Sequence, residues 1–422
     1  MTCQFPTYVE LRAEEDHLGM QVRAAARDGS EDDLNAAQNA YFASLAARYI
    51  AAHRVRKDRA RKARYGIPSK ETQAAAAAQL ALEIDVTRPC GEAVYIEAVN
   101  KGEGEYRLTC AYGELAQARQ QLIVNLLRWR EALPHAQTVL NGGRDAAIRK
   151  VQMNFAAGSR HNAELDVRRC FKSFRTENLS GLLRLPESVV EHVISIHSLV
   201  PVPSRTCRRD VLHHLPDDPE TPEVLFQALL GAEWEQARLG LPEGSRLSPV
   251  LAELLLTPVV RALGASRQGR VLTYADNFFL SATSEARLHW MIGNLQDRLA
   301  RHPAGPVTVR DDFAVRRPDE PFDFLGYRLT PRWGQLEVTW AAKHEEHARR
   351  LRREAYKLLR SDMPGHRKLE VLARVEREHT AFTRNFGAWP GRLDFNDEKL
   401  AKLRRVLFPR GGPEGTPSRR RS

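Results

Sequence analysis

One stretch of the chain, residues 271–280, places a single carboxylate between two apolar runs. Val-Leu-Thr-Tyr comes before Ala275-Asp276-Asn277, and Phe-Phe-Leu follows. Apolar and β-branched residues on both sides of a short polar segment predict two strands joined by a tight turn, with Asp276 at the turn. Asp-Asn is also ordinary turn chemistry. The stretch therefore predicts a hairpin and, taken alone, leaves the role of Asp276 open.

The charge balance indicates the kind of partner. The 422 residues are 42% hydrophobic and 28% charged, which is typical of a globular chain long enough for two or three domains. The 64 Lys and Arg exceed the 53 Asp and Glu, for a formal net charge of +11. This surplus favours a polyanionic partner, with nucleic acid first and an anionic membrane surface second. A generic basic protein is the alternative.

The cysteines and the apolar pattern argue against several other classes. None of the 5 Cys forms a C-x-x-C pair, which argues against a zinc site and a disulfide framework and fits a reducing cytosol. No basic-then-apolar signal segment follows Met1, and no run approaches the roughly 20 apolar residues of a membrane span. We expect a soluble, cytoplasmic protein with no membrane partner.

The N-terminal third of the chain predicts helices followed by a hairpin. Residues 7–65 have helical spacing and end in a strongly basic run at 53–64, which either follows a phosphate backbone or is a solvated face. The other predicted elements are a short alanine-rich helix at 74–78, strands at 93–99 and 106–110 with Lys101 and Arg107 in or near their turn, a helix at 114–131 and another from about 145.

The rest of the chain alternates loops with apolar segments. The predicted elements are a strand at 163–167, a loop at 201–222, a second loop at 240–249, a helix at 250–263 and basic helices from 342 and from 369 to 386. His213-His214 lies in the first loop, and no third metal ligand follows at a recognisable spacing. Ser248 is a natural N-cap, and Pro249 suits a first helical turn.

Two acids, Asp166 and Asp276, each end an apolar strand among basic segments. Mg²⁺ prefers carboxylate oxygens, few protein ligands and substrate phosphates. Phosphodiester formation with two metal ions requires acids that bridge the pair. Metal-assisted phosphoryl chemistry is therefore a hypothesis for these two residues, although their separation in the chain does not show that they meet.

Four segments form an ordered set of motifs. They are Asp166-Val167-Arg168-Arg169-Cys170-Phe171, 240–249, Tyr274-Ala275-Asp276-Asn277 and Phe324-Leu325-Gly326-Tyr327. Over roughly residues 90–395, this set resembles bacterial reverse transcriptases of the group II intron and retron-like type. In order, the segments are similar to the family's palm motif with a metal-binding Asp, its G-x-P-Q-G-x-x-x-S-P loop, its Y-A-D-D motif and its primer-grip element.

The resemblance implies an α+β, right-hand polymerase fold with a helical N-terminal extension. Residues 1–90 would be the basic extension, 91–341 the fingers and a palm with an antiparallel sheet, 342–395 a helical thumb, and 396–422 a basic, disordered tail. The tail is too short for an appended endonuclease.

The resemblance also implies roles for individual residues. Asp166, Asp276 and the Val167 carbonyl would hold two Mg²⁺ ions, with Mn²⁺ as a substitute, and position 277 belongs to the same catalytic motif. Phe171 would exclude the ribose 2′-hydroxyl. Substrate contacts would come from Lys101 and Arg107 at the triphosphate, and from Gly244, Ser245 and Ser248 under the new base pair.

Three departures from the family pattern bear on activity. Asn277 replaces the second acid of Y-A-D-D, Glu243 replaces the usual Gln of the loop, and residues 301–317 contain no Lys. A family Lys there can act as general acid. Arg310 or His302 are the alternatives, but a guanidinium is a poor proton donor near neutral pH.

These motifs predict an RNA-directed DNA polymerase that uses deoxynucleotides (dNTPs), an RNA template, a primer and their RNA–DNA hybrid. It would work alone or in a retroelement or antiviral defence system, with an associated structured RNA as a further partner. The alternative is a diverged, weakly active or inactive protein of the same fold that binds nucleic acid as a maturase, scaffold or defence component. A nucleotidyltransferase without a template is a third hypothesis.

Overall fold

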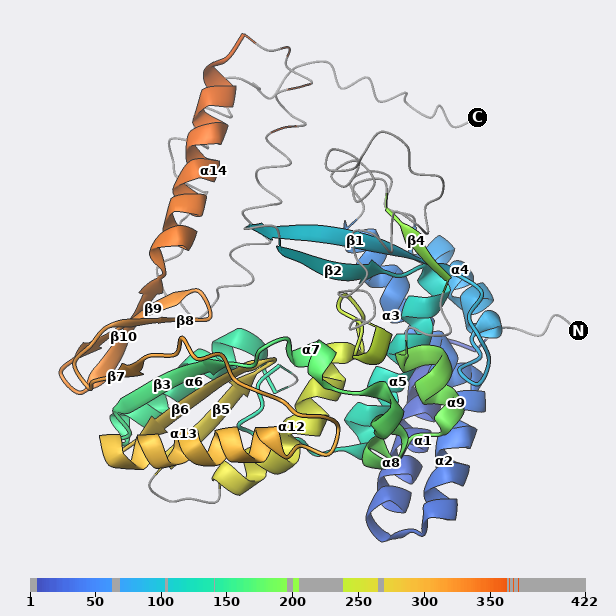
Figure 1. Ribbon diagram of the computed structural model, residues 1–422. Helices are drawn as coiled ribbons and strands as arrows, with labels where there is room; N and C mark the ends of the chain where they lie inside the picture. The colour runs from blue at the N-terminus through green and yellow to red at the C-terminus, as the bar shows by residue number, and fades with distance from the viewer. Residues whose placement is uncertain are drawn as a thin grey trace, which may run out of the picture.

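The computed structural model describes residues 6–62, 69–102, 105–139, 141–195, 200–204, 238–264 and 269–362, and the single residues 364, 367 and 371. Within these ranges the chain is a mixed α+β protein with three small sheets, as expected from the sequence. The second basic helix apart from residue 371, the tail after 395 and His213-His214 lie outside the described residues. Figure 1 shows the N-terminal helices on one side, two of the sheets on the other, and one long helix standing away from both.

The N-terminal helices pack into a bundle. They are α1 (Tyr8–Asp28), α2 (Glu31–Ala43), α3 (Leu45–Lys62), α4 (Lys70–Glu83) and α5 (Glu114–Arg130). The helical expectation for 7–65 is confirmed up to Lys62, and the chain turns twice within it. Thr7 and Ser30 each accept a hydrogen bond from the third helical amide, and the acid at that position bonds back, which specifies where α1 and α2 begin.

A three-stranded sheet follows, in the order β2-β1-β4. Its strands are β1 (Ala93–Gly102), β2 (Glu105–Ala111) and β4 (Val200–Pro203). The hairpin expected at 92–110 is present, with Tyr95 opposite Ala111. The prediction of a loop at 201–222 is wrong at its start, because β4 pairs in parallel with β1. A strand with two prolines can pair at an edge, where the missing amides face away from the ladder.

The four-stranded sheet has the order β5-β6-β3-β7. Its strands are β3 (His161–Asp166), β5 (Gly269–Tyr274), β6 (Asn277–Ala282) and β7 (Val315–Arg316). The hairpin predicted at 271–280 is β5–β6, and its turn is two residues long because Asn277 already pairs with Tyr274. Side chains alternate between two apolar layers, so that Phe278 and Leu280 belong to one core cluster and Phe279 to another.

Helices cover both faces of this sheet. Helices α12 (Ser248–Gly264) and α13 (Glu285–Ala300) share the first cluster with Phe278, and α6 (Gly143–Ala156) shares the second with Phe279. The second cluster continues into the sheet β10-β9-β8, formed by β8 (Phe322–Phe324), β9 (Tyr327–Arg332) and β10 (Gln335–Trp340). Phe279 stacks on Phe322 with ring centroids 5.6 Å apart. Helix α14 (Ala342–Arg360) then stands away from this sheet (Figure 1).

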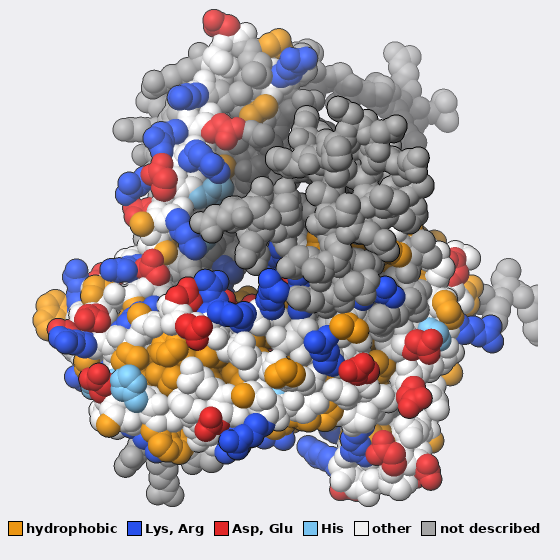
Figure 2. Space-filling model, in the orientation of Figure 1, with side chains coloured by type: hydrophobic (Ala, Val, Ile, Leu, Met, Phe, Trp, Pro, Cys, Tyr) orange, Lys and Arg blue, Asp and Glu red, His pale blue; other side chains and the backbone are white. Residues whose placement is uncertain are grey.

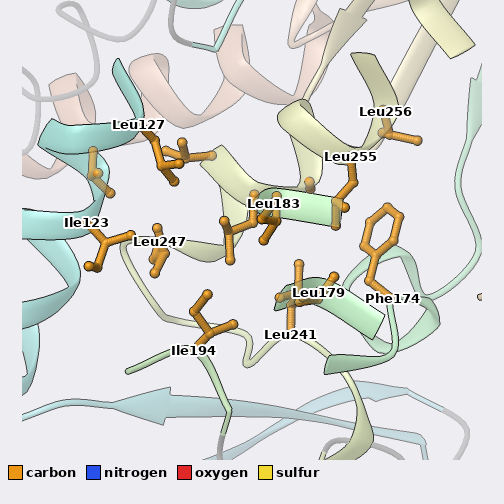
Figure 3. Packing of buried hydrophobic residues seen from close by; sticks show 14 of the residues in the cluster. Ile123, Leu127, Phe174, Leu179, Leu183, Ile194, Leu241, Leu247, Leu255 and Leu256 are labelled. Carbon is orange, nitrogen blue, oxygen red and sulfur yellow. The ribbon is translucent and has the colours of Figure 1, made fainter. Parts of the chain in front are cut away.

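Short helices connect the bundle to the sheet. They are α7 (Cys170–Ser173), η1 (Thr176–Asn178), α8 (Leu179–Leu183), α9 (Glu187–Val189) and η2 (Val190–Ile194). Figure 3 shows Ile123 and Leu127 of α5 on one side of a shared core, with Leu183 of α8 and Leu255 of α12 beside them. The bundle and the sheet therefore share one buried core. No helix among the described residues is long and apolar enough to cross a membrane.

Candidate functional site

The two predicted acids lie at adjoining strand ends. Strand β3 ends at Asp166, which is opposite Asn277, and Asn277 in turn is opposite Tyr274 across the β5–β6 turn. The Val167 amide donates to the carbonyl of Asp276 at 3.1 Å. Asp276 lies in the turn, after Ala275 at φ 54°, a left-handed conformation that closes the two-residue hairpin. Pairing of β3 with β6 thus brings Asp166 and Asp276 to one edge of the sheet.

Both acids line a cavity of about 780 Å³ above this edge. The Asp166 side chain is 41% exposed, and Asp276 is half-buried. Figure 2 shows basic and acidic side chains side by side around the hollow above the sheet. The cavity is lined by Arg107, Asp166, Val167, Arg168, Arg169, Cys170, Phe171, Lys172, Glu243, Asp276, Arg310, Asp311 and Asp312. A polyanionic ligand would find cations here on several sides of the paired carboxylates.

The segment after α13 is bonded to the end of β3. The Arg310 amide donates to the Asp166 carbonyl and the Arg168 amide to the Thr308 carbonyl, each at 2.8 Å. The Arg310 guanidinium lies 4.0 Å from the Asp166 carboxylate and 2.7 Å from that of Asp312. Of the two residues considered in place of the missing Lys, Arg310 therefore reaches the cavity. His302 does not line it, because its ring is buried against the Leu255 carbonyl, 2.8 Å away.

The loop at 240–249 contributes Glu243 to the lining of the cavity. The Cys110 amide of β2 donates to the Glu243 carbonyl at 2.7 Å, and the Leu241 amide donates to the Phe171 carbonyl at 2.8 Å. Gly244 has φ 93°, and a Cβ there would lie 2.4 Å from the Cys110 carbonyl oxygen. Glycine is required because the loop passes directly against β2 in a left-handed conformation.

The two serines of this loop hold its shape from inside. Ser245 is buried, and its hydroxyl accepts from the Leu247 amide at 3.1 Å. The Ser248 hydroxyl donates to the Pro242 carbonyl at 2.7 Å. The N-cap role expected for Ser248 is wrong, because its hydroxyl donates back to a loop carbonyl, and Ser248 is already the first residue of α12. The two hydroxyls thus stabilise the loop.

One ion pair closes the cavity between the hairpin and the loop. The Arg107 guanidinium on β2 binds the Glu243 carboxylate, which is only 12% exposed, whereas Arg107 is 43% exposed. An arginine that lines the cavity is therefore already neutralised by this chain's own carboxylate. Lys101 lies in β1, and its side chain is outside the described residues.

The cavity holds the thiol beside the acids in its neutral form. Burial raises the pKa of the Cys170 thiol well above its usual range, and the nearby carboxylates of Asp276, Asp166 and Glu243 raise it further. Thiolate chemistry is therefore disfavoured here. Phe171 is half-buried and packs against the first core cluster while lining the cavity. This placement suits either a core aromatic or a residue that limits the shape of a ligand.

The donor set suits a hard divalent ion with few protein ligands. Asp166 and Asp276 supply carboxylate oxygens at one edge, and Val167 lines the same cavity. The Asn277 amide donates to the Asp276 carboxylate at 3.3 Å, so it assists that acid without adding a charge. No set of three or more His, Cys, Asp or Glu side chains in the described part of the chain is arranged to hold a metal. Two carboxylates with open positions fit Mg²⁺, which retains water and substrate oxygens.

Five charged residues of the cavity were not predicted as site residues. They are Arg168, Arg169, Lys172, Asp311 and Asp312. The first three lie within six residues after Asp166 in the sequence, and this basic run was a signal that could have located them. Asp311 and Asp312 reach the cavity only because Val167 forms a bridge with Val309. No local pattern predicts that bridge.

Comparisons with solved structures give a distant likeness to telomerase. No protein-family model and no curated protein matches the chain. Apo telomerase from Candida tropicalis matches with a TM-score of 0.37 and 11% identity, over 74% of this chain and 61% of that one. Candida albicans telomerase in complex with a TWJ fragment of telomeric RNA matches with a TM-score of 0.31 and 12% identity, over 75% of this chain and 59% of that one. The chain thus has distant structural similarity to telomerase and spans less than two thirds of those chains.

Proposed function

We propose that this chain is an RNA-directed DNA polymerase that extends a primer with dNTPs, with two Mg²⁺ or Mn²⁺ ions held by Asp166, Asp276 and the Val167 carbonyl. The observation that carries the proposal is the placement of Asp166 and Asp276 on the floor of one cavity with cations around them. Bound there, the ions would neutralise charge on the reacting phosphate oxygens. In this proposal, residues 91–341 are the fingers and palm of a right-hand fold, and 342–395 the thumb.

The chain's own residues would mainly position the reactants. Reaction is by in-line attack of a primer 3′-hydroxyl on the α-phosphate, where alignment and charge neutralisation supply most of the rate. Arg107 and Lys101 would meet the triphosphate, and Arg310 lies beside Asp166. Phe171 would limit the sugar to a deoxyribose. Gly244, Ser245 and Ser248 would shape the wall under the new base pair.

The direct test is primer extension by the purified chain on an RNA template with an annealed DNA primer. With Mg²⁺ or Mn²⁺ we expect run-off products, and with a single dNTP we expect incorporation only where the template is complementary. Addition that ignores the template would instead indicate a terminal nucleotidyltransferase. If the chain binds the primed template but extends nothing with either ion, the polymerase proposal is wrong.

Two observations favour the second candidate, a protein of the same fold that binds nucleic acid without efficient synthesis. Asn277 removes a charge beside Asp276, and Glu243 already neutralises Arg107. Both weaken the attraction of the cavity for a metal–triphosphate complex. Asn277→Asp discriminates in the same assay: a gain in extension indicates an attenuated polymerase, and no gain with intact binding indicates a binding protein.

Glu243→Gln should increase the affinity of the cavity for dNTPs. The amide would release the Arg107 guanidinium to bind phosphate, while the backbone bond from Cys110 to residue 243 keeps the loop in place. We expect the KM for dNTP to fall about fivefold with kcat nearly unchanged, because an ion pair near the surface is worth up to ~1 kcal/mol. Steady-state extension at varied dNTP concentration measures both constants.

The matched control is Glu337→Gln, which removes the carboxylate that pairs with Arg332 at 2.9 Å across β9 and β10. This pair lies outside the cavity, so neither constant should change. An unchanged or higher KM in Glu243→Gln would show that Arg107 does not bind the nucleotide.

A further inference from the structure

A second cavity lies among the N-terminal helices. Its volume is about 230 Å³, and it is lined from three helices by Arg12, Glu15, Arg23, Arg54, Asn125, Arg128 and Trp129. We call it the helical cavity. It shares no lining residue with the cavity of Asp166 and Asp276. Helices α1, α3 and α5 contribute to it, and Figure 1 shows them together on the side of the molecule away from the four-stranded sheet.

Glu15 is the one acid among the described lining residues, and its neighbours hold it in place. The side chain is completely buried. One oxygen accepts from the Tyr41 hydroxyl at 2.5 Å and from the Trp129 indole at 3.2 Å. The other lies 3.0 Å from the Arg12 guanidinium. Glu15 therefore ties α1, α2 and α5 together and offsets the charge of Arg12, which leaves the other arginines of the cavity uncompensated.

Arg54 and Arg128 both line the helical cavity and are exposed to solvent. Neither forms an ion pair with any carboxylate in the part of the chain that the structure describes. Desolvation, and then repulsion from Arg54, lower the pKa of Arg128. Like charges held close together cost free energy unless a ligand neutralises them. An anion between these two guanidinium groups would remove that repulsion.

The side-chain nitrogen of Asn125, which lines the same cavity, has no hydrogen-bond partner among the described residues. Asn125 is only 6% exposed. Its carbonyl oxygen accepts from Gln121 at 2.8 Å, whereas its buried Nδ2 has no hydrogen-bond partner. A buried donor without an acceptor costs about 1–3 kcal/mol. The missing partner has to be an acceptor, and this is a second, independent indication that a ligand binds here.

We propose that the helical cavity binds a phosphate group between Arg54, Arg128 and the Asn125 amide. Phosphate offers several acceptor oxygens and a charge that suits two guanidinium groups. The volume suits one such group and little more. No base would stack on Trp129, because the Arg23 guanidinium lies over that ring, 5.5 Å from its centroid, and its Nε donates to the Trp129 carbonyl. The phosphate belongs either to a polynucleotide backbone or to a small molecule.

The test compares Arg54→Gln, Arg128→Gln and Asn125→Asp with wild type. Asn125→Asp keeps the acceptor for Gln121 and replaces only the free donor by an oxygen, so it reverses the preference for an anion with little change in shape. Arg27→Gln is the control, since Arg27 is exposed at the end of α1 and does not line the cavity. Circular dichroism of each variant checks folding.

Two probes identify the source of the phosphate. For single-stranded RNA, each arginine variant should weaken binding about five- to tenfold at low salt and reduce the slope of log K against log salt by about 0.7. For pyrophosphate and inorganic phosphate, thermal unfolding should show stabilisation of wild type that the variants lack. The first result identifies a backbone phosphate and the second a small phosphate.

Equal RNA affinity and equal phosphate response in wild type, Asn125→Asp and Arg128→Gln would overturn this proposal. Both readouts measure binding alone. The two binding measurements can therefore be interpreted even if primer extension fails. A negative result in the binding measurements does not contradict the polymerase proposal.

Discussion

Asp276→Asn and Asp166→Asn should each reduce primer extension at least about 10³-fold, or ~4 kcal/mol of transition-state stabilisation. An amide keeps the size of the side chain and removes the charge that Mg²⁺ prefers in a ligand. The ladder around Asp166 consists of backbone bonds, including the Arg310 amide to its carbonyl at 2.8 Å. The fold should therefore survive the change. Single-turnover extension with saturating dNTP measures the loss, and thermal unfolding measures the fold.

Asp323→Asn is the control for this pair. Asp323 pairs with Arg328 at 3.1 Å across β8 and β9 and does not line the cavity, so extension should remain within about twofold of wild type. Nucleic-acid binding by the Asp166 and Asp276 variants should stay equal or become tighter, because a negative charge is removed from the surface that faces phosphates. Full activity in either variant would contradict the assignment of the two acids.

The sequence predicted the local elements well because each depends on a short pattern. The β5–β6 hairpin follows from apolar runs on both sides of Ala275 and Asp276, and α12 follows from Pro249 and the apolar run after it. The two acids were located for the same reason, since each ends an apolar strand. Their meeting depends on β3 pairing with β6, and a pattern of alternation determines which face a side chain takes but not which strand lies beside it.

The contacts that could not be predicted are those between segments far apart in the chain. Arg107 and Glu243 pair because β2 lies against the 240–249 loop, and neither residue has a local signal for the other. The sequence offered both Arg310 and His302 as replacements for the missing Lys and did not distinguish between them. The bridge between Val167 and Val309 placed Arg310 in the cavity. The helical cavity likewise needs α1, α3 and α5 to meet. In the sequence of each helix taken alone, its arginines are the same as those of an ordinary solvent-exposed helix face.

Gly244→Ala should destabilise the chain by about 2–5 kcal/mol, through a left-handed conformation that costs roughly 1–2 kcal/mol and overpacking that costs about 1–3 kcal/mol. The new Cβ would lie 2.4 Å from the Cys110 carbonyl oxygen and 3.1 Å from its nitrogen. This clash can be relieved only if the loop moves away from β2. That movement breaks the hydrogen bond from the Cys110 amide to the Glu243 carbonyl and separates Glu243 from Arg107. Urea unfolding measures the free energy, and primer extension should fall with the loss of the cavity wall.

Two other glycines separate the causes of this effect. Gly143 has φ 67° and open space where a Cβ would stand, so Gly143→Ala should cost only the strain of about 1–2 kcal/mol. Gly293 lies within α13 and also has open space, so Gly293→Ala should stabilise the helix by roughly 0.5–1 kcal/mol. From most to least stable, the expected order is Gly293→Ala, wild type, Gly143→Ala and Gly244→Ala. If Gly244→Ala costs no more than Gly143→Ala, the loop can yield without strain, and close contact with β2 does not hold the cavity wall in place.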